Sequence, residues 1–142
     1  MIFGAHLSTA GGLELAFDSG VKLGCDCLQI FVKSQRQWRA PALGEQQIVE
    51  FKAARKRTGL APVVAHASYL INLASPVAAM RKRSVSAMVD ELQRCEALGV
   101  DYLVVHPGAF TDSDLEIGMK RIAKALDDIH KGAVGFESRI LL

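Results

Sequence analysis

The chain has 142 residues, half of them apolar, and a formal net charge of +2. Such a length is common for one domain, and 17 basic against 15 acidic residues do not by themselves indicate a nucleic-acid binder. No apolar run approaches the roughly 18 residues of a membrane span, and no charged leader precedes an apolar stretch. The odd set Cys25, Cys27 and Cys95 has no Cys-x-x-Cys pair, as is typical of thiols in a reducing compartment. We therefore expect a cytoplasmic protein with no membrane partner.

Short apolar runs alternate with amphipathic stretches along the chain. In chain order, the predicted strands are residues 2–5, 27–32, 62–65, 102–105 and a fifth that starts within 138–142. Each of the four intervals contains apolar residues at helical spacing, and a polar segment, residues 33–44, precedes the second helix. The pattern predicts four β/α units followed by one more strand.

The third and fourth predicted helices carry start signals. Ser75 fits an N-cap with Pro76 in the first turn, and Gly99 ends that helix. Its buried face is expected at Val85, Met88, Leu92 and Cys95. Ser113 and Glu116 can form a capping box for the next helix. The apolar stripe of that helix is predicted at Leu115, Met119, Ile122, Leu126 and Ile129.

Strands that alternate with helices favour parallel pairing with right-handed crossovers. A complete (β/α)₈ barrel, the TIM-barrel type, needs eight units and about 250 residues. Residues 1–142 would then form a partial barrel domain of the first four β/α units plus a fifth strand. The structural alternative is a small doubly wound sheet, which five strands would satisfy.

Three of the predicted strands end in the same way, because His6, His66 and His106 each follow an apolar run directly. The carboxyl ends of parallel strands share one rim, where active sites form. Neutral imidazole is the commonest zinc ligand. A single such histidine is typical of a hydrogen-bonded structural residue, whereas three at equivalent positions leave both a structural role and a metal site open.

Two further segments are expected on the same rim. Residues 33–39 interleave cations, amides and Trp38, so they could hold phosphates, read groove edges and stack on a base. A solvated loop with the indole tucked beneath it is the simpler interpretation. Residues 67–73 combine Tyr69 with apolar side chains, which would form either a packed turn or a wedge that enters a base stack.

Four strings occur in an order and spacing that resemble the endonuclease IV family. They are residues 4–8 (GAHLS), 33–38 (KSQRQW), 66–73 (HASYLINL) and 106–108 (HPG). The resemblance implies a (β/α)₈ barrel with a three-zinc cluster that hydrolyses the phosphodiester 5′ to an abasic site in double-stranded DNA. Ser34 and Ala67 depart from the family pattern without removing a ligand.

The resemblance also assigns roles to single residues. It implies that His66 and His106 are ligands of one zinc ion and that His6 supports them from outside the ligand set. It further implies that the loops facing the DNA carry Arg36, Gln37, Tyr69 and Leu70. In the family, strand five ends in a glutamate that bridges two zinc ions, and that position would directly follow Leu142. We therefore expect at most one partial zinc site here, and doubtful activity for these 142 residues alone.

Two other functions remain open at this point. A non-catalytic half-barrel could bind DNA weakly or self-associate, because a half-barrel leaves unpaired edge strands and one uncovered sheet face. A sugar isomerase or epimerase of the same barrel superfamily would share the metal-binding rim. It would lack the Gln-Arg-Gln-Trp loop and the Tyr-Leu wedge, so the sequence favours the DNA repair endonuclease.

Overall fold

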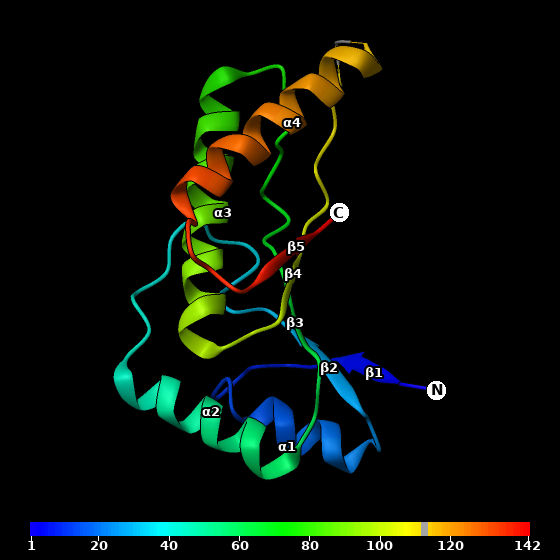
Figure 1. Cartoon of the computed structure of the whole chain (residues 1–142), viewed down its shortest axis with the longest axis vertical. Helices are drawn as coiled ribbons and strands as arrows, with labels where there is room; N and C mark the ends of the chain where they lie inside the picture. The colour runs from blue at the N-terminus through cyan, green and yellow to red at the C-terminus, as the bar shows by residue number, and fades with distance from the viewer. Residues whose placement is uncertain (112–113) are drawn as a thin grey trace.

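The computed structural model describes residues 1–111 and 114–142, in which strands and helices alternate along the chain (Figure 1). The strands are β1 (Gly4–His6), β2 (Cys27–Ile30), β3 (Val63–His66), β4 (Tyr102–Val104) and β5 (Arg139–Leu141). The helices are α1 (Leu15–Lys22), α2 (Glu45–Thr58), α3 (Ala78–Leu98) and α4 (Leu115–Gly132). Every predicted element is therefore present. In the part of the chain that the structure describes, no helix is long and apolar enough to cross a membrane.

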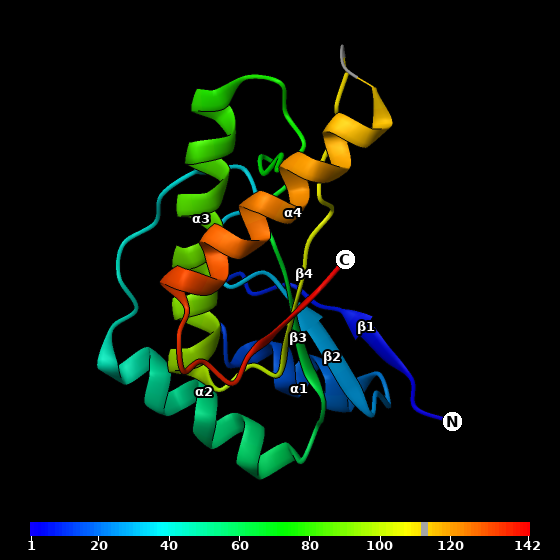
Figure 2. The same ribbon diagram turned by 45° about the horizontal axis from the view of Figure 1, so that its top comes forward.

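The five strands form one parallel sheet in the order in which they occur in the chain. A doubly wound sheet reverses its strand order, whereas a (β/α)₈ barrel adds each strand beside the previous one. The observed order therefore confirms the barrel-type prediction and excludes the doubly wound alternative. The sheet is open, with β1 and β5 at its two edges (Figures 1 and 2).

The two faces of the sheet differ because alternate residues of a strand point to opposite sides. One face packs against the helices and is fully buried at Leu28, Ile30, Val63, Ala65, Leu103 and Val105. The register places His6, Gln29, Val64 and Tyr102 in one row on the opposite face. All four are at least partly exposed. This second face would line the interior of a closed barrel.

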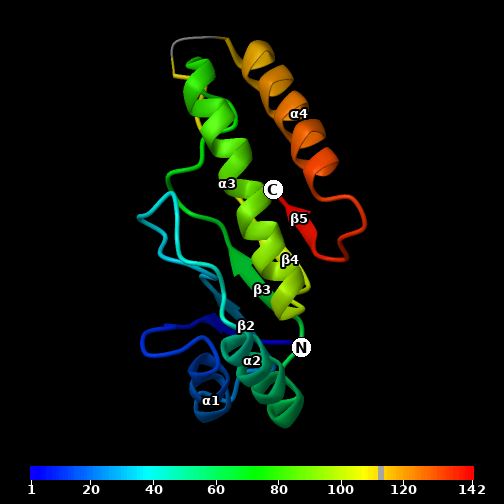
Figure 3. The same ribbon diagram turned by 90° about the vertical axis from the view of Figure 1, so that its left-hand side faces the viewer.

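The helices contribute the rest of the core. Phe17 of α1 and Phe51 of α2 are fully buried and meet edge to face, with ring centroids 4.9 Å apart. In α3 the predicted face is confirmed, because Met88, Leu92 and Cys95 are buried and Val85 is partly buried. That helix ends where predicted, at Gly99, whose φ of 72° is the left-handed conformation that favours glycine. Helices α3 and α4 lie side by side (Figure 3).

The start of α3 differs from the prediction. The helix begins at Ala78 rather than Pro76, and its N-cap position is Val77, which makes no side-chain cap. The Ser75 hydroxyl instead accepts a hydrogen bond from the Val77 amide at 3.2 Å. Ser75 therefore closes a turn that precedes the helix, which is the other local bond this side chain favours.

The start of α4 is capped by Asp114, whose carboxylate accepts from the Ile117 amide at 2.7 Å. The predicted capping box involves Ser113, which lies outside the described residues. The predicted apolar stripe is correct at three of its five residues. Ile129 is fully buried and Ile122 and Leu126 are partly buried, but Leu115 and Met119 are more than half exposed. The first turns of α4 thus expose apolar side chains, whereas its last turns bury Ile129.

An ion pair at the amino ends of β3 and β4 fixes the two strands that lead to His66 and His106. Asp101, directly before β4, accepts two hydrogen bonds from the Arg55 guanidinium, at 2.8 and 2.9 Å. The same carboxylate accepts from the Val63 amide at 2.7 Å, at the start of β3. Charge-assisted bonds of this kind are stronger than neutral ones. They hold β3 and β4 in register at the amino ends, and so align the opposite ends of both strands.

Candidate metal and nucleic-acid site

The three strand-end histidines meet at one rim, as predicted. His66 is central and buried, with its ring centroid 5.1 Å from that of His106 and 6.1 Å from that of His6. His6 and His66 end β1 and β3, whereas His106 lies two residues beyond the end of β4. Both His6 and His106 are exposed, so the cluster opens to solvent on two sides.

The hydrogen bond of His66 defines which of its nitrogens can bind a ligand. Its Nδ1 lies 2.8 Å from the carbonyl oxygen of Ala67. A carbonyl oxygen only accepts, so Nδ1 carries the proton and donates it. The lone pair of the neutral ring is then on Nε2, the arrangement that orients histidines that bind metals.

His6 has a different environment. Its ring packs against Phe31 at 4.5 Å between centroids, and Phe31 also meets His66 at 5.5 Å. Partial desolvation lowers the pKa of His6 below its usual value; a hydrogen bond with Gln29 opposes this shift and the charge of His66 adds to it. His6 is therefore favoured as neutral imidazole. Phe31 contacts both histidines. The sequence does not indicate this role, because Phe31 has the pattern of an ordinary strand residue.

The donor set fits part of a zinc site. A zinc site takes about four ligands, or three with a water. Within residues 1–111 and 114–142, no group of three or more His, Cys, Asp or Glu side chains is arranged to hold a metal ion. His66 and His106 are close enough to contribute two nitrogen ligands to one ion, and the chemistry of imidazole suits zinc.

The loop between β2 and α2 presents part of the predicted DNA-facing set. Arg36 and Gln37 are exposed. Lys33, one of the cations of residues 33–39 that could hold a phosphate on sequence grounds, is instead buried. Its side chain is 1% exposed and its Nζ lies 2.9 Å from Asp90 Oδ2 and 3.6 Å from Glu91 Oε1. A lysine so deeply buried between two carboxylates cannot also hold a phosphate at the surface.

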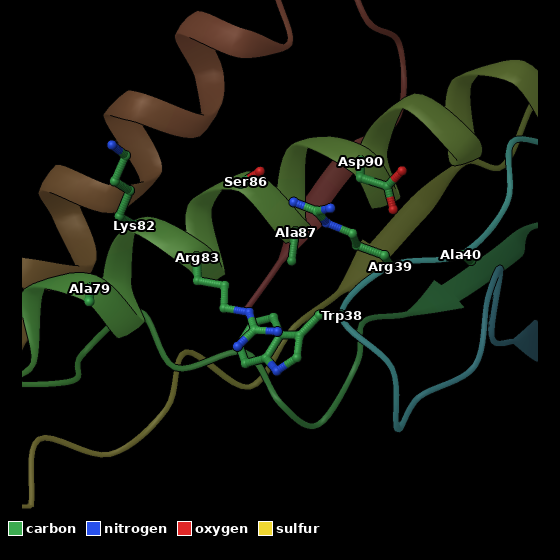
Figure 4. A pocket seen from close by; sticks show the side chains of 9 residues that line it. All are labelled: Trp38, Arg39, Ala40, Ala79, Lys82, Arg83, Ser86, Ala87 and Asp90. Carbon is green, nitrogen blue, oxygen red and sulfur yellow. The ribbon is translucent and has the colours of Figure 1, made fainter.

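Trp38 packs partly into the structure, in agreement with the simpler interpretation. The Arg83 guanidinium of α3 lies over its indole, 4.3 Å from the ring centroid (Figure 4). These two side chains line a cavity of about 890 Å³ between the loop and α3, together with Arg39 and Asp90. Trp38 therefore joins the loop to the helix, and its indole is not a free stacking platform.

The loop between β3 and α3 carries the second part of the set. Tyr69 is 64% exposed, and its ring lies 5.3 Å from that of His66 and 5.6 Å from that of Phe31, centroid to centroid. Leu70 is partly exposed beside it. An aromatic ring and a leucine at the edge of the histidine cluster could both contact an unstacked base pair.

The loop after β4 is joined by hydrogen bonds to the loop between β3 and α3. The carbonyl of Pro107 accepts from the amides of Leu73 and Ala74, at 2.9 and 3.2 Å. The Asn72 side chain donates to the Ala109 carbonyl at 3.0 Å. Gly108 has a φ of 100°, and a Cβ there would lie 2.2 Å from Asn72 Oδ1. These contacts fix His106 relative to His66.

These observations define half of a (β/α)₈ barrel with a histidine cluster at its carboxyl rim. A family model described as the xylose isomerase-like TIM barrel matches residues 17–135. The chain therefore belongs to this family.

The resemblance to endonuclease IV is also confirmed, over the N-terminal half of the relatives. A "Probable endonuclease 4" from Chloroflexus aggregans is 44% identical over 140 residues, which cover 99% of this chain and 49% of the relative. The crystal structure of endonuclease IV from Thermus thermophilus superposes with a TM-score of 0.81 at 35% identity, covering 92% of this chain and 46% of that one. The chain thus spans about half the length of the curated relatives it matches.

More distant structures share the fold. The 3-keto-D-glucoside 4-epimerase from E. coli superposes with a TM-score of 0.72 at 19% identity, covering all of this chain and 56% of that one. An identity this low shows the fold alone.

Proposed function

We propose that the chain forms the N-terminal half of the active rim of a zinc-dependent DNA repair endonuclease, which hydrolyses the phosphodiester 5′ to an abasic site. The observation that carries this proposal is the proximity of His66 and His106, with ring centroids 5.1 Å apart, next to exposed Tyr69 and on the same rim as the β2–α2 loop that exposes Arg36. The likeness of 44% to a probable endonuclease 4 supports it.

Each residue has a proposed role that follows from its position. His66 and His106 would each donate a ring nitrogen to one zinc ion, with His66 oriented by its bond to the Ala67 carbonyl. His6, neutral and packed on Phe31, would support the cluster without binding the metal. Bound zinc supplies an activated water and offsets charge on the phosphate and the leaving oxygen.

The DNA would lie across the two loops at the rim. Arg36 would pair with a phosphate and Gln37 with a base edge or phosphate, because both are exposed on the same loop. Tyr69 and Leu70 would occupy the space that a missing base leaves in the duplex, since both are at least partly exposed beside His66. Inserting these side chains costs the least free energy at an abasic site, because no base has to be unstacked there.

The epimerase alternative is weaker. The epimerases with the same fold are 15–22% identical to this chain, against 35% for the endonuclease IV structure. The exposed Arg36 and Gln37 on the β2–α2 loop also suit phosphate and base-edge contacts. The non-catalytic half-barrel remains the second candidate, because it is favoured by the open sheet edges and by Ile2 and Phe3, which are 68% and 63% exposed.

The proposal is tested by binding two duplexes that differ only in one abasic nucleotide. At moderate salt, fluorescence anisotropy should show that the 142-residue chain prefers the abasic duplex by roughly tenfold, the gain expected when an aromatic side chain stacks in place of a base. Tyr69→Ala should remove most of that preference but keep the binding of the intact duplex. Equal affinity for both duplexes would contradict abasic-site recognition.

A further inference from the structure

One side of α3 carries a polar stripe that is exposed at Arg83, partly buried at Asp90 and buried at Glu91 and Arg94. Arg83, Asp90, Glu91 and Arg94 are spaced seven, one and three residues apart, so they lie along one side of the helix. The Glu91 and Arg94 side chains are only 1% and 7% exposed. This stripe faces the loops that follow β2 and β3.

The stripe holds the β2–α2 loop by its carbonyl oxygens and its one buried cation. Lys33 Nζ contacts Asp90 at 2.9 Å and donates to the Trp38 carbonyl at 3.2 Å. Arg94 donates to the carbonyls of Ala40 and Pro41, at 3.1 and 2.8 Å. Both sides of the segment that presents Arg36 and Gln37 are therefore anchored to α3.

The same stripe holds the β3–α3 loop. Glu91 Oε1 accepts from the Ser68 amide at 3.0 Å. The Ser68 hydroxyl donates to the Gln35 carbonyl at 2.8 Å and accepts from the Leu70 amide at 3.3 Å. Ser68 thus ties the base of the Tyr69–Leu70 segment both to α3 and to the neighbouring loop.

The two carboxylates of the stripe have pKa values that are shifted in opposite directions. Desolvation raises the pKa of Asp90, but hydrogen bonds from Lys33 and Arg94 outweigh it and leave that pKa below its usual value. Burial raises the pKa of Glu91, against the bond from Ser68 and the charge of Lys33. Two cations and two carboxylates cancel in net charge, yet desolvating them is costly, and apolar residues of similar size often stabilise a fold more.

What the charges provide is directional geometry, because each bond fixes a loop atom to a defined place on a rigid helix. We propose that Lys33, Asp90, Glu91 and Arg94 form a clamp that sets the two DNA-facing loops in one relative arrangement before DNA binds. These four are positioning residues, which act through Arg36, Gln37, Tyr69 and Leu70. The inference rests on the proposed function and deepens it. Loops ordered in advance lose less entropy on binding, so affinity rises without new contacts.

The test separates positioning from stability with the variants Lys33→Met, Glu91→Leu and the two combined. Lys33→Met leaves the Glu91 charge buried without its closest cation, so it should lower the Tm most. The double variant removes both charges and should recover most of the Tm. It should nevertheless bind the abasic duplex about tenfold more weakly. Without the clamp, DNA binding itself would have to order the long side chains of the two DNA-facing loops. Amide hydrogen exchange at Ser68 should become faster.

Two controls keep the outcome interpretable. Asp18→Asn combined with Arg57→Met removes an exposed ion pair between α1 and α2, and should change neither DNA affinity nor exchange at Ser68. Lys33→Met should leave zinc affinity unchanged, whereas Glu91→Leu removes the acceptor of the Ser68 amide, which shares a peptide group with the Ala67 carbonyl that accepts from His66.

The clamp is refuted if the double variant recovers its Tm and also binds and exchanges as the wild type does. The cluster would then serve stability alone. If the wild-type chain does not prefer the abasic duplex, the proposed function fails separately, and the exchange at Ser68 still decides whether the clamp orders the loop.

Discussion

His66 and His106 are the two residues whose chemistry the account depends on most. Their rings lie with centroids 5.1 Å apart, and the Nδ1 of His66 is hydrogen-bonded to the Ala67 carbonyl. Their proximity was predictable from the sequence, since both follow an apolar strand directly. The hydrogen bond that selects Nε2 of His66 was not, because it depends on the turn of the chain after β3.

We predict that His66→Ala and His106→Ala each weaken zinc binding by at least about tenfold, since even the loss of an outer partner costs that much. Competition with a chromophoric chelator measures the change. His130→Ala is the matched control, because His130 is an exposed histidine near the end of α4. Zinc affinity that survives the loss of both His66 and His106 would place the metal elsewhere.

Arg36 is the residue on which DNA contact can be tested most simply. Arg36→Ala should weaken duplex binding and flatten the dependence of log K on log salt by about 0.9, the effect of one lost phosphate contact. Lys56→Ala is the control, because Lys56 is an exposed cation near the end of α2, which leads to the opposite end of the sheet. An unchanged slope for Arg36→Ala would remove this residue from the interface.

Whole elements were easier to predict from the sequence than the contacts between them. The alternation of apolar runs with helical spacing located all five strands and four helices within the described residues, because it follows directly from which side chains are buried. Helix starts were less accurate, as at Ser75, because a short polar side chain satisfies a turn as well as a cap.

The polar stripe of α3 shows why the rest could not be predicted. On a helix, Glu91 and Arg94 read as a solvated face, whereas the structure buries both under the β2–α2 loop. Lys33 likewise read as a free cation of a basic loop. Lys33 and its partner Asp90 lie 57 residues apart in the chain, and no local sequence pattern indicates such a pairing.

At the level of the rim loops, Gly108 connects local conformation to the site. Gly108→Ala should destabilise the fold by about 1–3 kcal/mol through its positive φ and its clash with Asn72, and should also weaken zinc binding by displacing His106. Chemical denaturation and chelator competition measure the two effects. Gly24→Ala is a matched control, because Gly24 has a φ of 72° but no atom within 4 Å of the added Cβ. Equal effects of both changes on zinc binding would contradict the proposed role of Asn72 and Gly108.

Considered as a whole, the molecule is an open parallel sheet with helices packed against one face and the histidine rim at the carboxyl ends of its strands. Its other face and its edge strands expose apolar side chains, among them Phe3 at 63% and Leu141 at 41%. Exposed strand edges of this kind favour association with further strands. The same surfaces are therefore where additional strands of a barrel, and with them additional metal ligands, would be placed.

The central claim is that this chain supplies half of a zinc-dependent rim that cuts abasic DNA, and incision of an abasic duplex tests it most directly. The purified 142-residue chain with zinc should self-associate and show negligible incision, because on this proposal His66 and His106 would provide two ligands where a site needs about four. Adding the C-terminal half of the Thermus thermophilus endonuclease IV should give a single mixed species and zinc-dependent incision 5′ to the abasic site. That incision should disappear with His66→Ala in this chain. Robust turnover by the chain alone, abolished by His66→Ala, would contradict the incomplete site, and a stable mixed species that never cuts would contradict the nuclease.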